Sequence, residues 1–187
     1  RKMLGMRMIP ATGEAEDLLI RVQERAPGSE LGERASLALG EVYFNQAEMT
    51  EAVVAYDMFL LNYPNTRFRE GAMLNLIRAS LAMFKGPRFD PHGLIDAAER
   101  ISVYREEFPA AAEQLGANSL LLRINESLAI KTYYSAEWYY RTGERVSAVY
   151  LYRRVVKDYP HTVAAQAATR WLETKGESIV DSASYRQ

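Results

Sequence analysis

Hydrophobic positions recur every three or four residues along most of this chain, which is the spacing of one face of an α-helix. In the segment 52–63, Ala52, Tyr56, Phe59 and Tyr63 share one such stripe. Pro64 follows directly. Because proline lacks a backbone N–H and biases its predecessor away from helical geometry, it ends the helix. A second helical stretch follows, so the pattern predicts a unit of helix, tight turn and helix.

This unit recurs through a frame of three residues: an alanine, a proline twelve residues later, and a second alanine eight residues after that. The four copies are Ala15/Pro27/Ala35, Ala52/Pro64/Ala72, Ala97/Pro109/Ala117 and Ala148/Pro160/Ala168. Small residues let two helices approach closely, and a lone hairpin cannot bury its apolar face. The repetition therefore predicts stacked hairpins in an all-α, tetratricopeptide-like solenoid. Three side chains lie where an oxygen can cap the second helix of a unit: Ser29, Thr66 and Thr162.

The intervals between the four prolines lengthen along the chain. One gains a segment rich in glycine and proline, KGPRFDPHG (85–93). The next gains a stretch without internal proline, which predicts one extended helix over about 111–142, with a bend near Gly116 or at 125–127 as an open alternative. We expect a flexible N-terminal segment (1–13), a single repeat domain (14–176) and a polar C-terminal tail (177–187). The basic start, RKMLGMRMIP, lacks the apolar run of an intact export signal.

Composition and motifs argue against an enzyme. Lys and Arg number 23 and Asp and Glu 24, so the chain has no excess of positive charge that would attract nucleic acid. No apolar run is long enough for a transmembrane helix. Without cysteine there is no disulfide or thiolate metal site. His92 and His161 lack metal-ligand spacing, and no phosphate-binding loop or serine-nucleophile motif occurs. We expect no catalytic, cofactor or metal site in these residues; an enzyme would need a catalytic domain outside them.

Candidate binding residues fall into three groups, each with an ordinary structural alternative. Aromatic residues crowd the end of the long predicted helix, where they either fill the core or form an interface. Arginines nearby either bind partner carboxylates or form a solvated helix face. Three further residues are candidates for the lining of a concave peptide groove or for ordinary surface. The docking candidates are Tyr133, Trp138, Tyr140, Arg141, Arg145, Arg153 and Arg154; the groove candidates are Tyr43, Asn75 and Arg78.

Three stretches carry a resemblance to a known family: AVVAYDMFLLNYPNT (52–66), FDPHGLIDAAERISVYREEFP (89–109) and LAIKTYYSAEWYYRTGERVSAVYLYRRVVKDYPHT (128–162). The chain resembles BamD-type proteins, the tetratricopeptide-like lipoproteins of the bacterial outer-membrane β-barrel assembly machinery. Asp90 lies in the insert that this family carries before its third repeat. Leu128, Ala129, Tyr139, Tyr140, Gly143, Ser147 and Ala148 resemble positions of its long helix and of the step that follows.

The resemblance implies a non-enzymatic scaffold at the periplasmic face of the outer membrane, with a lipid anchor upstream of Arg1. It implies protein partners rather than cofactors or nucleic acid. In such proteins the C-terminal repeats dock a membrane-embedded partner, and the N-terminal repeats receive the C-terminal ends of unfolded barrel substrates. The alternative that stays open is a general periplasmic or cytosolic tetratricopeptide adaptor, unrelated to barrel assembly.

Overall fold

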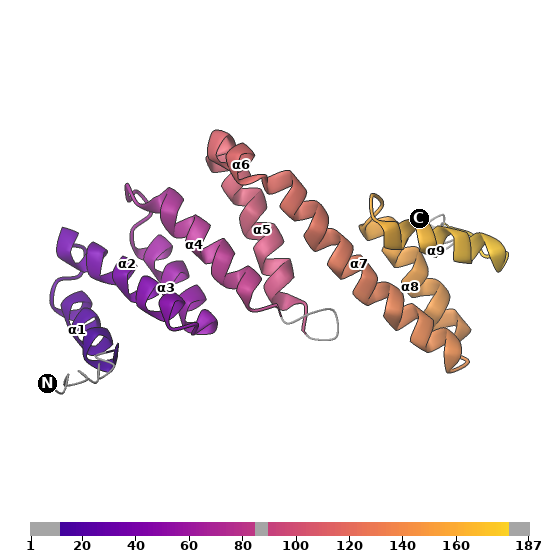
Figure 1. Ribbon diagram of the computed structural model, residues 1–187, viewed down its shortest axis with the longest axis horizontal. Coiled ribbons are helices and arrows are strands. Elements are labelled where there is room, and N and C mark those ends of the chain that lie inside the picture. The colour runs from indigo at the N-terminus through magenta and orange to yellow at the C-terminus, as the bar shows by residue number, and fades with distance from the viewer. Residues whose placement is uncertain (1–11, 85–89, 180–187) are drawn as a thin grey trace, which may run out of the picture. The chain divides into compact units, whose positions relative to one another are not determined.

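The computed structural model describes residues 12–84 and 90–179, and all regular structure within these ranges is helical (Figure 1). The chain divides into two compact units, an N-terminal unit that ends at Met83 and a C-terminal unit that starts at Phe84. Both units consist of packed helical hairpins, which confirms the all-α, tetratricopeptide-like class predicted from the repeats. The tails expected at 1–13 and 177–187 lie mostly outside the described residues, and the single domain expected over 14–176 stays a prediction.

The N-terminal unit contains four described helices, each packed against the next in the chain. Its core lies between the third and fourth of them. Tyr56 and Phe59 are fully buried there in one cluster with Leu76, and Gly40 of the second helix lies close to the Tyr56 ring. A Cβ atom added to Gly40 would stand 2.7 Å from the Tyr56 ring, so a glycine is needed for this helix contact. The four helices are α1 (Thr12–Arg25), α2 (Glu30–Asn45), α3 (Met49–Asn62) and α4 (Arg69–Ala82).

The C-terminal unit is organised around one long helix, α7, which contacts each of the other four helices described there. Its core lies where α7 meets α8 and α9 and includes Ala136, Ala148, Tyr152 and Leu172. Ala148 is buried there as the repeat frame predicts, and Ala136, which is outside the frame, is a second buried small residue of this core. The five helices are α5 (His92–Glu107), α6 (Pro109–Leu115), α7 (Ala117–Arg141), α8 (Arg145–Asp158) and α9 (Val163–Thr174).

The extended helix is confirmed, but its predicted start is wrong. Gly116 has φ 70° and ψ 37°, the left-handed conformation, and its backbone N–H bonds to the carbonyl oxygens of the preceding turn. Glycine adopts this geometry at little steric cost and commonly ends a helix in it. Residues 111–115 therefore belong to the separate helix α6, and α7 runs from Ala117 to Arg141 without interruption at 125–127. Its 25 residues span about 37 Å.

Two of the three predicted caps are confirmed. The Ser29 side chain accepts a hydrogen bond from Gly32 N at 3.0 Å, and the Thr162 side chain accepts one from Ala165 N at 3.1 Å. The prediction for Thr66 is wrong, because its oxygen accepts from Phe68 N and α4 begins one residue later, at Arg69. The intervening turn places Thr66 too far from the first turn of α4 to cap it.

The frame alanines are buried with one exception. Ala52, Ala97 and Ala148 are completely inaccessible, and the second alanine of every frame is buried as well, at Ala35, Ala72, Ala117 and Ala168. Ala15, in contrast, is exposed on α1. Among the described helices, α1 has its extensive contacts with α2.

A carboxylate from the long helix also fixes the last hairpin. Glu126 of α7 accepts hydrogen bonds from Val163 N at 2.7 Å and Ala164 N at 3.1 Å. These N–H groups lie in the first turn of α9, where intrahelical acceptors are lacking and the helix dipole favours a negative charge. The α9 N-terminus is thereby tied to α7 by a contact between residues far apart in the sequence.

Candidate protein-interaction surfaces

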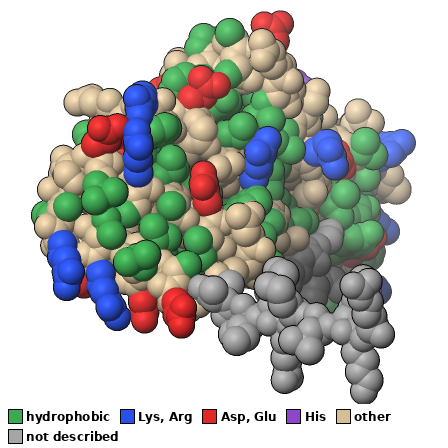
Figure 2. Space-filling model, turned by 60° about the vertical axis from the view of Figure 1, so that its left-hand side comes forward, with side chains coloured by type: hydrophobic (Ala, Val, Ile, Leu, Met, Phe, Trp, Pro, Cys, Tyr) green, Lys and Arg blue, Asp and Glu red, His purple; other side chains and the backbone are tan. Residues whose placement is uncertain are grey.

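A groove opens between α1, α2 and α3 in the N-terminal unit, with a volume of about 370 Å³. We call it the α1–α3 groove. Its floor is largely apolar, and its side chains Val54 and Met58 are 57% and 48% exposed. Figure 2 turns the N-terminal side of the chain toward the viewer, and hydrophobic side chains lie open on this face among charged ones. The lining residues are Gln23, Ser36, Leu39, Tyr43, Thr50, Glu51, Val54, Ala55, Met58 and Asn62.

The groove exists because α3 is apolar on two faces. One stripe, Ala52, Tyr56 and Phe59, is buried in the hairpin core. A second stripe at i, i+4 and i+7, formed by Val54, Met58 and Leu61, is exposed. An amphipathic surface helix needs only one apolar face, so a second one left in solvent is typical of a binding surface.

One end of the groove is acidic. The Tyr43 hydroxyl donates a hydrogen bond to the Glu16 carboxylate, which joins α2 to the start of α1. This hydrogen bond, then burial and the charges of Glu16, Glu48 and Glu51, raises the pKa of Tyr43 to about 12. Tyr43 therefore stays a neutral donor at physiological pH. Three carboxylates, one on α1 and two at the start of α3, thus act on one groove-lining hydroxyl, and they give this end of the groove a negative potential.

The structure does not bring the three predicted groove residues together. Tyr43 lines the α1–α3 groove, whereas Asn75 and Arg78 lie on α4 and are not among its lining residues. Asn75 instead hydrogen-bonds Tyr56, whose pKa is nevertheless raised to about 12, chiefly by burial. Sequence reasoning missed Leu39, Val54 and Met58. The signal was present for two of them in the second apolar stripe of α3.

The aromatic run at the end of α7 divides between core and surface, as its helical spacing requires. Tyr133 is half-buried, with its ring edge-on to Tyr152 at 5.2 Å. Tyr134 and Trp138, one turn apart, are 60% and 54% exposed. Tyr140 is partly exposed, edge-on to the Trp171 ring at 5.0 Å. Tyr134 and Trp138 are therefore the most exposed members of the run.

Three of the four predicted arginines bind groups of their own chain. The Arg145 guanidinium contacts the Glu177 carboxylate at 2.8 Å, and Arg153 Nε donates to the Ser178 carbonyl oxygen at 2.6 Å. Arg154 pairs with Asp158 one turn away on α8. Arg141 is exposed at the end of α7. Arg145 and Arg153 thus hold the segment 175–178 along α8, an arrangement that local periodicity does not predict.

Two exposed residues of α8 were missed by sequence reasoning. Val146 and Tyr150 are 84% and 57% exposed and lie one turn apart. Their i, i+4 spacing was the available signal. Like Tyr134 and Trp138, they are large hydrophobic side chains more than half exposed, and Leu122 and Tyr140 of α7 are exposed as well. We call Tyr134, Trp138, Val146 and Tyr150 the α7–α8 aromatic surface.

A comparison with known protein families shows which family the chain belongs to. The model of the family YfiO, described as outer membrane lipoprotein, matches residues 11–181 and so extends over both units. The chain belongs to this family. No curated protein matches it. The comparison therefore shows the family, that of outer membrane lipoproteins, which the resemblance to BamD-type proteins predicts. Membership of this family associates the chain with the cell envelope.

The YfiO family is one of non-enzymatic scaffolds. None of the helices described in this member has both the length and the apolar character needed to cross a membrane.

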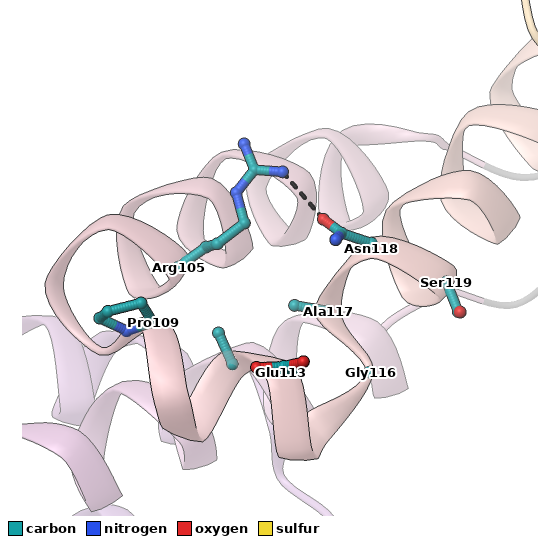
Figure 3. A pocket seen from close by; sticks show the side chains of 8 residues that line it. Arg105, Pro109, Glu113, Gly116, Ala117, Asn118 and Ser119 are labelled. Atoms are coloured by element: carbon teal, nitrogen blue, oxygen red, sulfur yellow. Dashed lines mark hydrogen bonds between the residues drawn. The ribbon is translucent and has the colours of Figure 1, made fainter.

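A second pocket in this YfiO-family chain lies at the break between α6 and α7 and has a volume of about 380 Å³ (Figure 3). Arg105 of α5 donates a hydrogen bond to the Asn118 side chain at 3.0 Å, across from Glu113 of α6. This contact ties α5 to the first turn of α7 beside Gly116. The pocket brings a guanidinium and a carboxylate near a turn, and the hydrogen bond between Arg105 and Asn118 supports a structural role for it.

Proposed function

We propose that this chain is a non-enzymatic scaffold of the BamD type, which takes part in outer-membrane β-barrel assembly at the periplasmic face of the outer membrane. The observation that carries the proposal is membership of the outer membrane lipoprotein family over residues 11–181. Packed hairpins with exposed apolar side chains support it, because stacked helical repeats offer extended surfaces for protein partners. A lipid anchor would attach the chain to the membrane.

The C-terminal unit would dock a folded partner of the assembly complex through the α7–α8 aromatic surface. Trp138 is the best anchor, because tryptophan supplies a large rigid ring and is enriched where interfaces concentrate their binding energy. Arg141 adds an exposed positive charge at the end of α7. The other predicted docking residues, Tyr133, Tyr140, Arg145, Arg153 and Arg154, would support this surface from beneath or beside it.

The N-terminal unit would receive unfolded barrel segments. The α1–α3 groove offers an apolar floor for alternate side chains of an extended peptide, and Tyr43 offers a hydroxyl at its acidic end. Asn75 and Arg78, on α4, would contact a peptide that continues beyond the groove.

Affinity purification from crosslinked native membranes tests this function. The full-length protein is expected to recover an outer-membrane β-barrel protein. Trp138→Ala should lower that recovery by roughly tenfold or more, since truncation of a buried interface tryptophan costs about 2 kcal/mol or more. Val163→Ala, at an exposed residue of α9, is the matched control and should leave recovery unchanged. Recovery of soluble or cell-wall proteins alone would contradict barrel assembly and favour the general adaptor.

A further inference from the structure

We propose that the α1–α3 groove selects extended peptide segments that carry a lysine or arginine at one end, followed by apolar side chains at alternate positions. This inference deepens the peptide binding proposed above and rests on it, because it takes the groove as a peptide site and names the segments that fit. Three features of the groove carry it: a negative charge at one end, an apolar floor with regular spacing, and a neutral polar end that includes a buried amide.

The negative end of the groove lies at the turn between α2 and α3. Glu16 of α1, Glu48 just before α3 and Glu51 in its first turn all act on the Tyr43 hydroxyl there. Residues 12–62 contain ten acidic residues but three basic ones. The basic residues lie in the halves of α1 and α2 next to the turn that joins these helices, at the other end: Arg21, Arg25 and Arg34. Basic residues of α1, α2 and α3 therefore do not neutralise the carboxylates, and this end favours a cation.

The apolar floor has the spacing of an extended chain. Val54 and Met58 are successive members of the exposed stripe of α3, one turn apart and separated by about 6 Å along the helix axis. Side chains on one face of an extended peptide recur every two residues, or about 6.6 Å. A segment laid along α3 thus places alternate side chains against Val54 and Met58, with its basic residue next to Glu51. The α3 lining runs from Thr50 to Asn62, about 18 Å, the length of about five extended residues.

The opposite end of the groove is lined by neutral polar side chains, those of Gln23 and Asn62 near the ends of α1 and α3 and that of Ser36 on α2. The Gln23 side-chain nitrogen is buried and has no hydrogen-bond partner among the described residues. Buried donors are almost always hydrogen-bonded in folded proteins, so this amide indicates an acceptor from outside the helices. A backbone carbonyl oxygen of the bound segment would supply it after a small rotation of the flexible side chain. A charge at one end and an amide at the other fix the orientation of the segment.

Fluorescence anisotropy with the full chain and two dye-labelled peptides tests this proposal. One peptide is Lys-Thr-Val-Thr-Leu-Thr with blocked termini, and the other has glutamate in place of the lysine, so they differ only in the charge at one position. The lysine peptide should bind about tenfold more tightly or better, because like charges at the end near Glu51 disfavour the glutamate peptide. Glu48→Lys together with Glu51→Lys should reverse this preference.

The matched control is Glu70→Lys together with Glu106→Lys. Both residues are exposed and neither lines the groove, so this pair changes the net charge equally and should leave the preference unchanged. Circular dichroism checks that the variants fold. The milder pair Glu48→Gln and Glu51→Gln should weaken the preference in the same direction as the lysine pair.

The buried amide has a test of its own. Gln23→Met keeps the length of the side chain but removes the donor, and it should weaken binding of both peptides about threefold or more. Gln46→Met is the matched control and should change neither affinity. The Gln46 nitrogen is likewise buried without a hydrogen-bond partner in the described part of the chain, but Gln46 does not line the groove. Unchanged binding in Gln23→Met would overturn the contact assigned to this amide.

Four outcomes would overturn the proposal as a whole. Equal affinities of the two peptides for the wild-type chain would contradict charge selection, and so would a preference that survives Glu48→Lys and Glu51→Lys. Absence of binding by either peptide would show that the groove is not a site for extended segments. A dimer in sedimentation that Val54→Glu dissociates would assign the groove to a second copy of the chain. No outcome depends on recovery of a barrel protein from membranes, so this proposal and the proposed function can fail separately.

Discussion

Replacement of Ala148 by arginine is expected to unfold the C-terminal unit. Ala148 is completely inaccessible in the core that α7, α8 and α9 share, beside Tyr152 and Leu172. An arginine side chain has no room there, and its charge would be buried without a partner. Overpacking and an unpaired buried charge together cost more than about 4 kcal/mol, a large part of the stability of a small domain.

Both tryptophans of the chain, Trp138 and Trp171, lie in this unit, so their fluorescence during urea unfolding reports on it directly. The matched control is Tyr150→Arg, two residues further on the same helix at an exposed position. It should change the free energy of unfolding by no more than about 0.5 kcal/mol. An Ala148→Arg variant with a wild-type unfolding midpoint would show that the repeat frame is wrongly placed.

Replacement of Gly32 by alanine is expected to destabilise the N-terminal unit by about 3 kcal/mol, at the upper end of what overpacking costs. The new Cβ would stand 2.3 Å from the carbonyl oxygen of Ala26, a backbone atom that no side-chain rotation can move away. That oxygen also accepts a hydrogen bond from the Ser29 hydroxyl at 2.7 Å. Relief of the clash would therefore disturb the α1–α2 turn and the cap of α2 together.

Gly71→Ala gives the opposite expectation and serves as the control. Gly71 lies in α4, and a Cβ there would meet no atom within 4 Å. Alanine should stabilise this helix by up to about 1 kcal/mol through its higher helix propensity. Thermal unfolding followed by circular dichroism compares the two variants. If both variants shifted the melting temperature equally and in the same direction, the close contact between Gly32 and the Ala26 carbonyl oxygen would be contradicted.

The hairpins of this fold could be predicted from sequence because short-range signals specify them. Proline, a capping oxygen and alanine act within one turn, and Pro160, Thr162 and Ala168 have the predicted roles. The break at Gly116 was harder to predict. A glycine inside a helical pattern is compatible with a helix, a bend or a left-handed stop, and packing of α5, α6 and α7 decides among them.

The candidate surfaces could be predicted less well, because they depend on contacts between distant residues. Exposure of aromatic side chains such as Trp138 could be predicted, because the aromatic residues crowded at the end of one helix cannot all face the core. In contrast, Arg145 and Arg153 bind the segment 175–178, about 25 to 32 positions away. The α1–α3 groove likewise combines three helices, and only the second apolar stripe of α3 indicates it in advance. Helical periodicity shows which face is apolar but not what covers it.

The most direct test of the central claim is site-specific crosslinking in cells. A photo-crosslinking amino acid placed at position 138 of the full-length protein would capture whatever lies against the α7–α8 aromatic surface, and position 163 on α9 serves as the comparison. An outer-membrane β-barrel protein crosslinked from position 138 but not from position 163 is the result that this account predicts. Crosslinks from position 138 to soluble or cell-wall proteins alone would contradict it.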